Sequence, residues 1–447
     1  MAFRAPHETL YGRCWCKSGT DEVQSLRNIC CNVLIRDARL LRRVLHTVPA
    51  AFIRVLLARA VQDGRDRAAQ LLVSVWPDRS LSLPDVLGGS CPLIHHPERI
   101  AAATAILRAF VDFALRGEHH HLRFLDATGF QVGPELLIFI KLEIETWRES
   151  LRSLRKHSRR SPRTLRCDIF VVGERSFTVL MSVLQHQLPK CVLRIDISNM
   201  QVEGVGETKL LQLLETLNPD ALAGLGLAYN SVQNLGLSVI LERLRCFPAL
   251  TALDLSSNCI SFIDARLRDC LSDSLLNMPL LQRLSLKSCR IGGQLGALIA
   301  RCPPKMTHLD LSACGLQSGD LVAIGQMQSL TSLMLSDNNF SDVLPELVLP
   351  RLQVLDLSNC KLRPDLFVTL WRSVRASNSS LCLLDLAWNK FSVKNFAVIL
   401  EDLESGLFPH LVHLWLPLPA NPCPACFELA QRMNAVSPHL TVDTHLV

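Results

Sequence analysis

The sequence predicts an α/β solenoid, in which short parallel strands alternate with helices, preceded by an N-terminal helical region. Two observations predict this fold. A leucine-based pattern recurs nine times in the C-terminal two thirds of the chain, and the segment before it has apolar residues at helical spacing. The chain has 447 residues, of which 49% are hydrophobic and 20% charged, so it is too apolar to be disordered throughout. Its length suits two or three domains or one elongated array.

The recurring pattern matches the template L-x-x-L-x-L-x-x-(N/C)-x-L. One clear copy runs through Leu250, Leu253, Leu255, Asn258 and Ile260, and the copies follow one another at spacings of 22 to 31 residues. One such unit cannot bury its own apolar face, so the copies must stack. The spacing leaves room for a helix or a 3₁₀ turn between strands. This pattern is typical of a leucine-rich-repeat horseshoe, with a parallel sheet on the concave face and helices on the convex face. Other copies begin at Val192, Leu222, Leu281, Met306, Leu330, Leu352, Leu381 and Leu411.

Each L-x-L segment is predicted to be a strand whose two leucines are buried, because side chains alternate between the faces of a strand. Residues 122–127 and 165–171 are interpreted as degenerate strands of the same array, so the solenoid is expected to span residues 122–447. Cysteine replaces asparagine at the turn position in three copies, at Cys289, Cys314 and Cys360. We expect these thiols to be buried and reduced. The strands expected most clearly are Leu253–Leu255, Leu284–Leu286, Leu309–Leu311, Leu333–Leu335 and Leu355–Leu357.

The N-terminal part divides into a tail, residues 1–24, and a helical region, residues 25–121. The helical region opens with apolar residues at positions i, i+3, i+4, i+7 and i+8, which form one face of a helix. These residues are Leu26, Ile29, Cys30, Val33 and Leu34.

Charge is distributed unevenly along the chain. Residues 1–170 hold 26 Lys and Arg against 17 Asp and Glu, whereas residues 171–447 hold 21 against 24. This asymmetry suggests two parts with different partners. The basic run Arg152–Arg166 fits either a solvated loop, which we favour, or a nuclear-import or nucleic-acid contact.

The sequence predicts a protein of the cytoplasm or nucleus. The first residues lack the apolar core of a secretory signal, and no stretch of 18 apolar residues is free of charge, which disfavours a membrane span. The 17 cysteines are scattered through apolar runs, as expected for buried thiols in a reducing compartment.

A short motif at the start of the helical region has the form S-L-x-x-x-C-x-x-x-L. It comprises Ser25, Leu26, Cys30 and Leu34 and fits the BC-box, a helix that places a leucine and a small cysteine into a groove of elongin C. The alternative interpretation is an ordinary amphipathic core helix, since short motifs also match by chance. A proline-led apolar helix downstream stands where a cullin-2 box would lie. Its candidate contact residues are Pro49, Phe52, Ile53 and Leu56.

An acidic row is expected on the concave face. The residue between the two strand leucines is aspartate in five of the nine copies. The functional interpretation is a groove that selects a basic peptide, with two apolar residues of the same row as anchors. The alternative is that L-D-L is simply a common form of the repeat. The candidate substrate-binding residues are Asp196, Asp254, Asp310, Met334, Asp356, Asp385 and Trp415.

No catalytic motif is present. The chain has no phosphate-binding loop, no H-E-x-x-H and no G-x-S-x-G, and its scattered cysteines and histidines do not form a spaced set of four zinc ligands. We therefore expect no enzyme activity, no catalytic residues, no cofactor, no metal and no small-molecule substrate.

The segments before the repeats occur in a distinctive order. They are VPAAFIRVLLARAV (residues 48–61), LLVSVWP (71–77), LSLPDVL (81–87), LRFLDATG (122–129) and LRCDIFVVGERSF (165–177). This order, followed by the repeats, resembles the PRAME family and the related leucine-rich repeat-containing protein 14 group over roughly residues 25–447.

The resemblance implies a non-enzymatic adaptor that binds other proteins. PRAME-like proteins act as substrate receptors of cullin-2 ubiquitin ligases through elongin B/C. The leucine-rich repeat-containing protein 14 group is also linked to restraint of NF-κB signalling through the IκB kinase complex. Two hypotheses follow: a ligase receptor with elongin B/C, cullin-2 and a substrate protein as partners, or a stand-alone scaffold or inhibitor that recruits no ligase.

Overall fold

The computed structural model describes residues 26–87, 97–116, 121–153, 163–185, 193–341, 347–377, 379–418 and 424–446. The chain forms two compact units. Unit 1 comprises residues 1–205 and 212–225, and unit 2 comprises residues 206–211 and 226–447. Over the described residues the strands form one thirteen-stranded sheet in which they follow one another in chain order, β1 to β13. Their pairing is parallel, as a solenoid requires.

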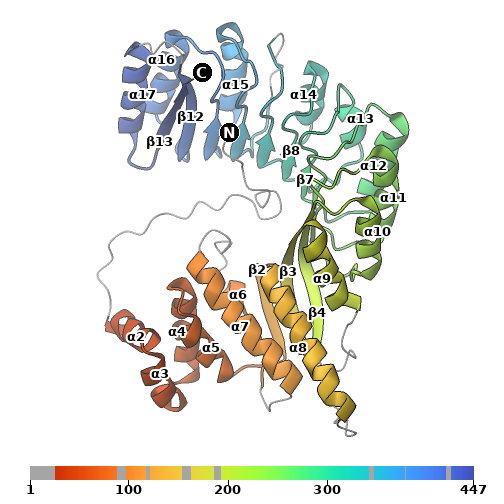
Figure 1. Cartoon of the computed structure of the whole chain (residues 1–447). Coiled ribbons are helices and arrows are strands. Elements are labelled where there is room, and N and C mark those ends of the chain that lie inside the picture. The colour runs from red at the N-terminus through yellow and green to blue at the C-terminus, as the bar shows by residue number, and fades with distance from the viewer. Residues whose placement is uncertain are drawn as a thin grey trace. The chain divides into compact units, whose positions relative to one another are not determined.

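Unit 1 contains a helical region followed by long strands (Figure 1). Its helices are α2 (Leu26–Arg36), α3 (Ala38–Val44), η1 (Leu45–Thr47), α4 (Ala50–Gln62), α5 (Asp66–Ser74), α6 (Leu83–Val86), α7 (Pro97–Arg116), α8 (Pro134–Ser153) and α9 (Gly173–Gln185). Its strands are β1 (Ser80–Ser82), β2 (Phe124–Val132), β3 (Arg163–Val172) and β4 (Leu193–Glu203).

The sheet begins earlier than the sequence predicts. Strand β1 lies within the region expected to be helical and pairs with β2, with Leu81 opposite Leu125. Both leucines are buried. Trp76, which is also buried, anchors this strand because its indole nitrogen donates to the Ser80 carbonyl at 3.0 Å. Leu81 and Leu83 match the L-x-L part of the template, but Asp78 and Val86 stand at its leading-leucine and turn positions, so the repeat pattern does not reveal this strand.

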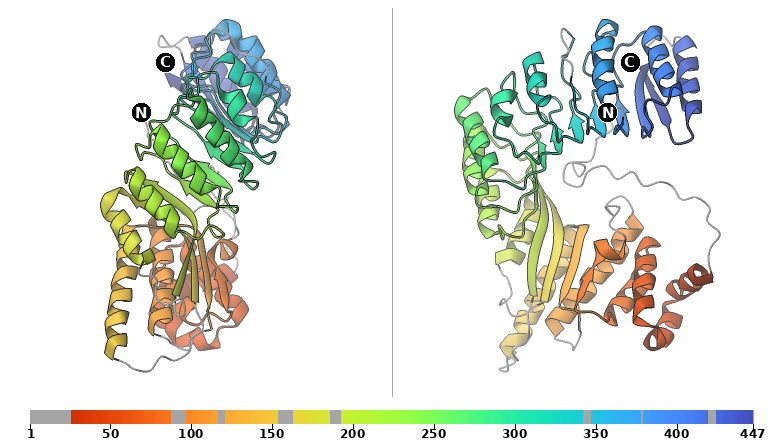
Figure 2. Two further views of the ribbon diagram at one scale, coloured as in Figure 1. Left: turned by 90° about the vertical axis from the view of Figure 1, so that its right-hand side faces the viewer. Right: turned by 180° about the vertical axis from the view of Figure 1, so that it is seen from behind.

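Strands β2, β3 and β4 are long because they continue beyond the L-x-L segment through irregular pairing. The register shifts between Ala127 and Gln131 of β2 and again at Cys167 and Asp168. The buried Asp168 carboxylate bridges this irregularity, accepting from the Gly129 backbone at 2.7 Å and from the Asn199 side chain at 2.8 Å. Helices α7 and α9 pack against these strands (Figure 2).

Unit 2 contains most of the regular repeats, and its helices form one layer while its strands form the other (Figure 1). The division between the units falls within α10 (Glu207–Thr216) and β5 (Gly224–Gly226). The helices of unit 2 are α11 (Asn234–Leu244), α12 (Ala265–Leu276), α13 (Leu295–Ile299), α14 (Ser318–Ile324), η3 (Pro364–Leu366), α15 (Phe367–Ala376), α16 (Val393–Glu404) and α17 (Pro424–Val436). Its strands are β6 (Ala252–Asp254), β7 (Arg283–Ser285), β8 (His308–Asp310), β9 (Ser332–Met334), β10 (Val354–Asp356), β11 (Leu383–Asp385), β12 (His413–Leu418) and β13 (Thr441–Leu446).

The leucine pattern determines this part of the fold as predicted. Strands β6 to β10 each begin one residue before the predicted L-x-L segment, and both leucines of each segment are buried. Leu309 and Leu311, for example, are 1% and 0% exposed. The predicted leucine-rich-repeat solenoid is therefore confirmed, while β1 and β13 at the two ends of the sheet were not predicted.

The turn after each strand is held by the asparagine or cysteine side chain of the template. The Asn258 amide donates to the Leu227 and Leu255 carbonyls at 2.9 and 3.0 Å. Its oxygen accepts from the Asn230 and Val232 backbones at 3.0 and 3.1 Å, which ties one repeat to the repeat before it.

The cysteines at this position are buried and free, as predicted. Cys314 donates from its thiol to the Leu286 carbonyl at 3.0 Å, and Cys360 donates to Leu335 at 3.1 Å. A thiol is a weaker donor than an amide and lacks the amide's carbonyl oxygen. Cysteine therefore performs only part of the role of asparagine.

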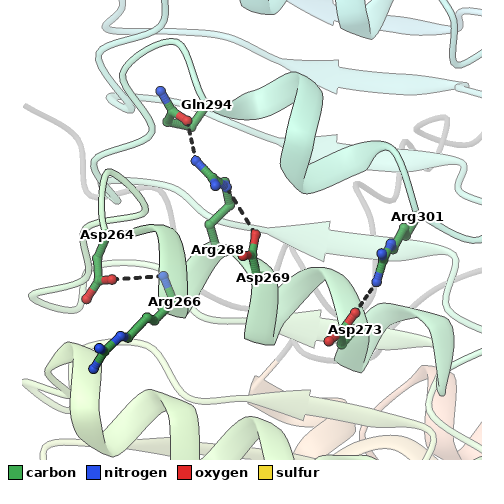
Figure 3. A network of polar contacts seen from close by, with 7 residues as sticks. All are labelled: Asp264, Arg266, Arg268, Asp269, Asp273, Gln294 and Arg301. Atoms are coloured by element: carbon green, nitrogen blue, oxygen red, sulfur yellow. Dashed lines mark hydrogen bonds and ion pairs between the residues drawn. The ribbon is translucent and has the colours of Figure 1, made fainter.

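Polar contacts join neighbouring helices on the side of unit 2 away from the strands (Figure 3). Asp264 caps α12 by accepting from the Arg266 backbone at 3.0 Å. Arg268 donates to the side chain of Gln294 in the next repeat at 2.6 Å, and Arg301 pairs with Asp273. These contacts fix adjacent repeats to one another at the surface.

Candidate functional site

Helix α2 is the clearest candidate for an interaction site because apolar side chains lie on its outer face. Leu26 is 77% exposed, and Ile29 and Val33 are 46% and 54% exposed. Cys30 is exposed and Leu34 is half-buried. These residues share one side of a helix by their spacing, so they form a continuous apolar stripe, which we call the α2 face.

The opposite side of α2 packs into unit 1. Cys31 and Ile35 are both 2% exposed, and the helix contacts α3 and α4. The side chain of Asn32 accepts from the Arg59 guanidinium on α4 at 3.0 Å. Asp37 then caps α3 by accepting from the Arg39 and Leu40 backbones. These contacts hold α2 in place while the α2 face is left toward solvent.

The predicted elongin-binding residues are therefore placed where a partner can reach them. Leu26 and Cys30 lie on the α2 face, and Leu34 lies at its half-buried edge. Ser25 lies outside the described residues, as do the tail of residues 1–24 and most of the basic run, residues 154–162. Ile29 and Val33 are not part of the motif but belong to the same face, and their helical spacing was the signal for them.

The predicted cullin-binding residues are only partly accessible. Pro49 is exposed at the start of α4, and Phe52 is half-buried. Ile53 and Leu56 are 5% and 0% exposed, so both face the core of the helical region and not its surface. The reason is that α4 is a central helix, in contact with α2, α5, α6 and α7, and its apolar residues form the core of the helical region.

Most of the predicted concave-face residues do lie in one row. Within unit 2 the strand register places Asp254, Ser285, Asp310, Met334, Asp356, Asp385 and Trp415 opposite one another in successive strands. Asp196 lies on β4, where it accepts from Arg194 at 2.7 Å.

The expectation that the aspartates form an exposed stripe is wrong. Asp254 and Asp356 are each 2% exposed, Asp196 and Asp385 are also buried, and Asp310 is half-buried. The physical reason is local. The carboxylates of Asp254, Asp310 and Asp356 each accept from the backbone nitrogen two residues later, at 2.8, 3.0 and 2.9 Å. Such Asx turns provide a hydrogen-bond acceptor for the backbone N–H group where the chain leaves the strand.

Burial also changes the acidity of one member of this row, Asp310. It raises the pKa of Asp310 above its usual value, and the negative charge of Asp356 acts in the same direction. Hydrogen bonds from Ser312 and the charge of Lys287 oppose this shift. A buried carboxylate engaged by its own backbone is poorly suited to attract a basic peptide.

The apolar members of the row remain accessible in part. Met334 and Trp415 are both half-buried. The Trp415 ring stacks on His413, with ring centroids 5.3 Å apart and planes 13° apart. An aromatic pair on a strand face is a common feature of protein-binding surfaces.

The motif segments of unit 1 have structural roles. In residues 122–129, Asp126 accepts from the Thr128 backbone at 3.0 Å, and Gly129 has a φ of +86°, which glycine adopts without strain. Asp168 in the following segment holds the Gly129 backbone. These residues shape the irregular strands rather than a chemical site.

Among the described residues no group of three or more metal-ligating side chains comes together. Across the same residues no helix is both long and apolar enough to cross a membrane.

Comparison with known proteins agrees with this architecture. Leucine-rich-repeat family models match residues 248–261, 329–349 and 351–371. The chain is 26% identical over 464 aligned positions to leucine-rich repeat-containing protein 14 of Xenopus laevis, and the match covers 91% of this chain and 90% of that protein. The stacked strands, the asparagine and cysteine turns and this similarity lead to one conclusion: the chain is a leucine-rich-repeat protein homologous to leucine-rich repeat-containing protein 14.

Proposed function

We propose that this protein is a non-enzymatic adaptor, and that it serves as the substrate-recognition subunit of a cullin-2 ubiquitin ligase by docking elongin C through the α2 face. The observation that supports the proposal is the outward orientation of this face. Leu26, Cys30 and Val33 project from a helix whose other side is packed against α4. An apolar stripe that faces water on a fixed helix has an unfavourable solvation free energy and does not stabilise the fold. Such a stripe is typical of a surface that another protein covers.

The chemistry of the α2 face suits docking of a helix into a groove. A leucine at one end can fill an apolar pocket, and a small cysteine one turn later allows close approach of the partner. Because Cys31 and Ile35 already bind α2 to unit 1, the helix needs no reordering before it binds. Preorganisation of this kind lowers the entropic cost of association.

The substrate surface in this proposal is the strand face of unit 2. Its accessible members are the half-buried Met334 and the stacked pair of His413 and Trp415, while the aspartates serve the fold. We therefore propose that a protein substrate is recognised by apolar and aromatic contacts on this face rather than by an acidic groove.

The direct test is co-purification of elongin B/C with the full chain. Leu26→Ala combined with Cys30→Phe should abolish co-purification, because the change removes the pocket-filling side chain and blocks close approach. The matched control is Ile138→Ala with Leu142→Ala, an exposed apolar pair at i, i+4 on α8, which are 44% and 55% exposed. This control should retain elongin. If wild-type protein never retains elongin, the ligase proposal fails.

One observation favours a second function. The burial of Ile53 and Leu56 removes half of the expected cullin contacts, and a protein without them would bind partners without recruiting a ligase. The second proposal is accordingly a stand-alone scaffold or inhibitor of a signalling complex of the IκB kinase type. The two functions separate by immunoprecipitation of wild-type protein, because only the first brings down elongin B/C and cullin-2 together.

A further inference from the structure

The C-terminal end of the strand face carries an exposed carboxylate beside the aromatic pair. Strand β13, which the sequence did not predict, pairs with β12 so that Asp443 lies opposite Trp415 and Thr441 lies opposite His413. Paired residues of neighbouring strands are about 4.8 Å apart and point to the same face of the sheet. The row that contains Met334 and Trp415 therefore continues to Asp443.

Asp443 differs from the other aspartates of this row in its exposure. Asp385, which lies opposite Trp415 on its other side, is 8% exposed, and its carboxylate accepts from the Ala387 backbone at 3.0 Å. Asp443 is exposed, and within the described part of the chain no side-chain hydrogen bond or ion pair engages its carboxylate. The row as a whole is thus no acidic groove, but its last carboxylate is accessible to a ligand.

His413 joins Trp415 and Asp443 into one cluster, which we call the Trp415 cluster. The His413 ring stacks on that of Trp415, and the charge of Asp443 acts on His413 in the direction that raises its pKa. Burial outweighs this effect, so the pKa of His413 is lowered from its ordinary value. The imidazole is therefore neutral at neutral pH and does not neutralise the charge of Asp443.

The charged residues of the last three strands are acidic. Residues 383–385, 413–418 and 441–446, which form β11, β12 and β13, hold two aspartates and neither lysine nor arginine. Strand β7 differs, since Arg283 lies within it and Lys287 follows two residues after its end. Negative charge at one end of a binding face attracts a ligand of positive charge.

A tryptophan ring beside a carboxylate suits the side chain of arginine. The planar guanidinium group stacks on aromatic rings and donates two parallel hydrogen bonds to a carboxylate. Tryptophan is also the aromatic residue that attracts cations most strongly. Trp415 is half-buried and stacked on His413, so it is held in place while part of it remains accessible.

We propose that Trp415 and Asp443 bind an arginine side chain of a substrate protein, with the indole as the stacking surface and the carboxylate as the ion-pair partner. His413 positions the indole. The inference rests on the proposed use of the strand face as the substrate surface, and it names the chemistry that this face selects. It does not depend on elongin docking at the α2 face.

The probe is a phage-displayed library of random twelve-residue peptides, panned against the full-length protein. Counter-selection uses Trp415→Leu, which keeps an apolar side chain on the strand. The enriched peptides should share an arginine. A synthetic copy of the most enriched peptide, and a second copy with citrulline in place of that arginine, are then titrated by calorimetry. Citrulline has nearly the same shape as arginine but no charge, so the second copy should bind at least about tenfold more weakly.

Asp443→Asn, which takes no part in the selection, tests the ion pair. It should weaken binding of the arginine peptide at least about tenfold and leave binding of the citrulline peptide nearly unchanged, since losses at two contacting groups are not additive. The matched control is Glu428→Gln, which removes an exposed carboxylate from α17 and should bind both peptides as wild type does. In chemical denaturation Asp443→Asn should be as stable as wild type, because the side chain is exposed.

The possible failures can be told apart. Peptides that require Trp415 but share no arginine, or an arginine peptide that binds Asp443→Asn with undiminished affinity, would overturn this inference and leave the strand face as the substrate surface. A library without any Trp415-dependent peptide would overturn the strand-face proposal as well. Co-purification of elongin tests the ligase proposal separately, because it reports on the α2 face.

Discussion

The cysteines of this chain show how one residue type serves two environments. Cys289, Cys314 and Cys360 are buried at the turn position, and burial raises the pKa of Cys314 to about 12. Cys30 and Cys246 are exposed. Because the thiolate is the reactive species, a buried thiol with a raised pKa reacts slowly even where a reagent can reach it.

The prediction is that maleimide labels Cys30 and Cys246 of the native protein well before Cys289, Cys314 and Cys360. Labelling at neutral pH, followed by digestion and mass spectrometry, gives the rate for each peptide. The denatured protein serves as the control, in which all five should react. Native disulfides among the three turn cysteines would contradict both their placement and the expected reducing compartment.

His308 connects stability to pH. Burial, helped by the nearby positive charge of Arg283, lowers the pKa of His308 to about 4. In the unfolded chain the imidazole has its ordinary pKa of about 6.5. Between pH 4 and pH 6.5 the imidazole is protonated in the unfolded chain but neutral in the folded protein. Lowering the pH through this range therefore favours unfolding.

The stabilisation linked to a neutral His308 should thus be complete above pH 6.5 and decline as the pH falls toward 4. The free energy of unfolding of wild type should fall by up to about 1.4 kcal/mol per pH unit more steeply than that of His308→Gln in this range. Urea denaturation of both proteins at several pH values measures the difference. Parallel pH profiles would show that His308 titrates normally.

At the scale of elements, the leucine template predicted the strands well because its physical basis is local. Leu309 and Leu311 point into the core since strand side chains alternate, and no distant contact is needed to infer it. The same reasoning placed Asp254 and Asp356 in one row but missed their burial. Exposure depends on how closely adjacent repeats approach and on the Asx turns, which are not visible in the strand pattern.

Helix α2 shows a second feature that the sequence pattern cannot predict, the side of a helix that faces the core. Its spacing identified the apolar face of Leu26, Ile29 and Cys30, yet spacing alone cannot say which side of a helix faces the core. Cys31 and Ile35, which lie four residues apart, form the buried side of the helix. The amphipathic pattern therefore predicted the helix and its apolar face. Which side of the helix faces the core is set by the packing of α2 against α4.

The asparagines at the turn position give a prediction for the stability of the repeats. Asn258→Ala removes the side chain that binds the Leu227 and Leu255 carbonyls and the Asn230 and Val232 backbones. Each buried group left without a partner costs about 1–3 kcal/mol, so unfolding should become easier by at least about 2 kcal/mol. Chemical denaturation measures the loss.

A graded control is Asn258→Cys, which recreates the arrangement at Cys314. It should lose less stability than Asn258→Ala, because a thiol still donates to the preceding repeat, as Cys314 does to Leu286. Equal losses of stability for the two variants would show that the hydrogen bonds of the turn side chain do not explain the choice of residue at this position.

At the scale of the whole molecule, the sequence predicted a repeat array with a helical region before it, and the structure agrees. It did not predict that the first strand, β1, lies between helices at residues 80–82, or that β13 closes the sheet at residues 441–446. Terminal strands of a solenoid lack a neighbour on one side and are released from the repeat pattern.

The proposed account assigns different tasks to the two units. Unit 1 presents the α2 face, and unit 2 presents the strand face with the half-buried Met334 and Trp415.

The central claim is that the α2 face binds elongin C. Hydrogen–deuterium exchange of the full chain, with and without purified elongin B/C, tests it at the proposed site. The account predicts that elongin B/C slows amide exchange in Leu26–Arg36 of wild type but has no effect on the Leu26→Ala, Cys30→Phe variant. Unchanged exchange of Leu26–Arg36 in wild type, with elongin B/C in large excess, would contradict the account.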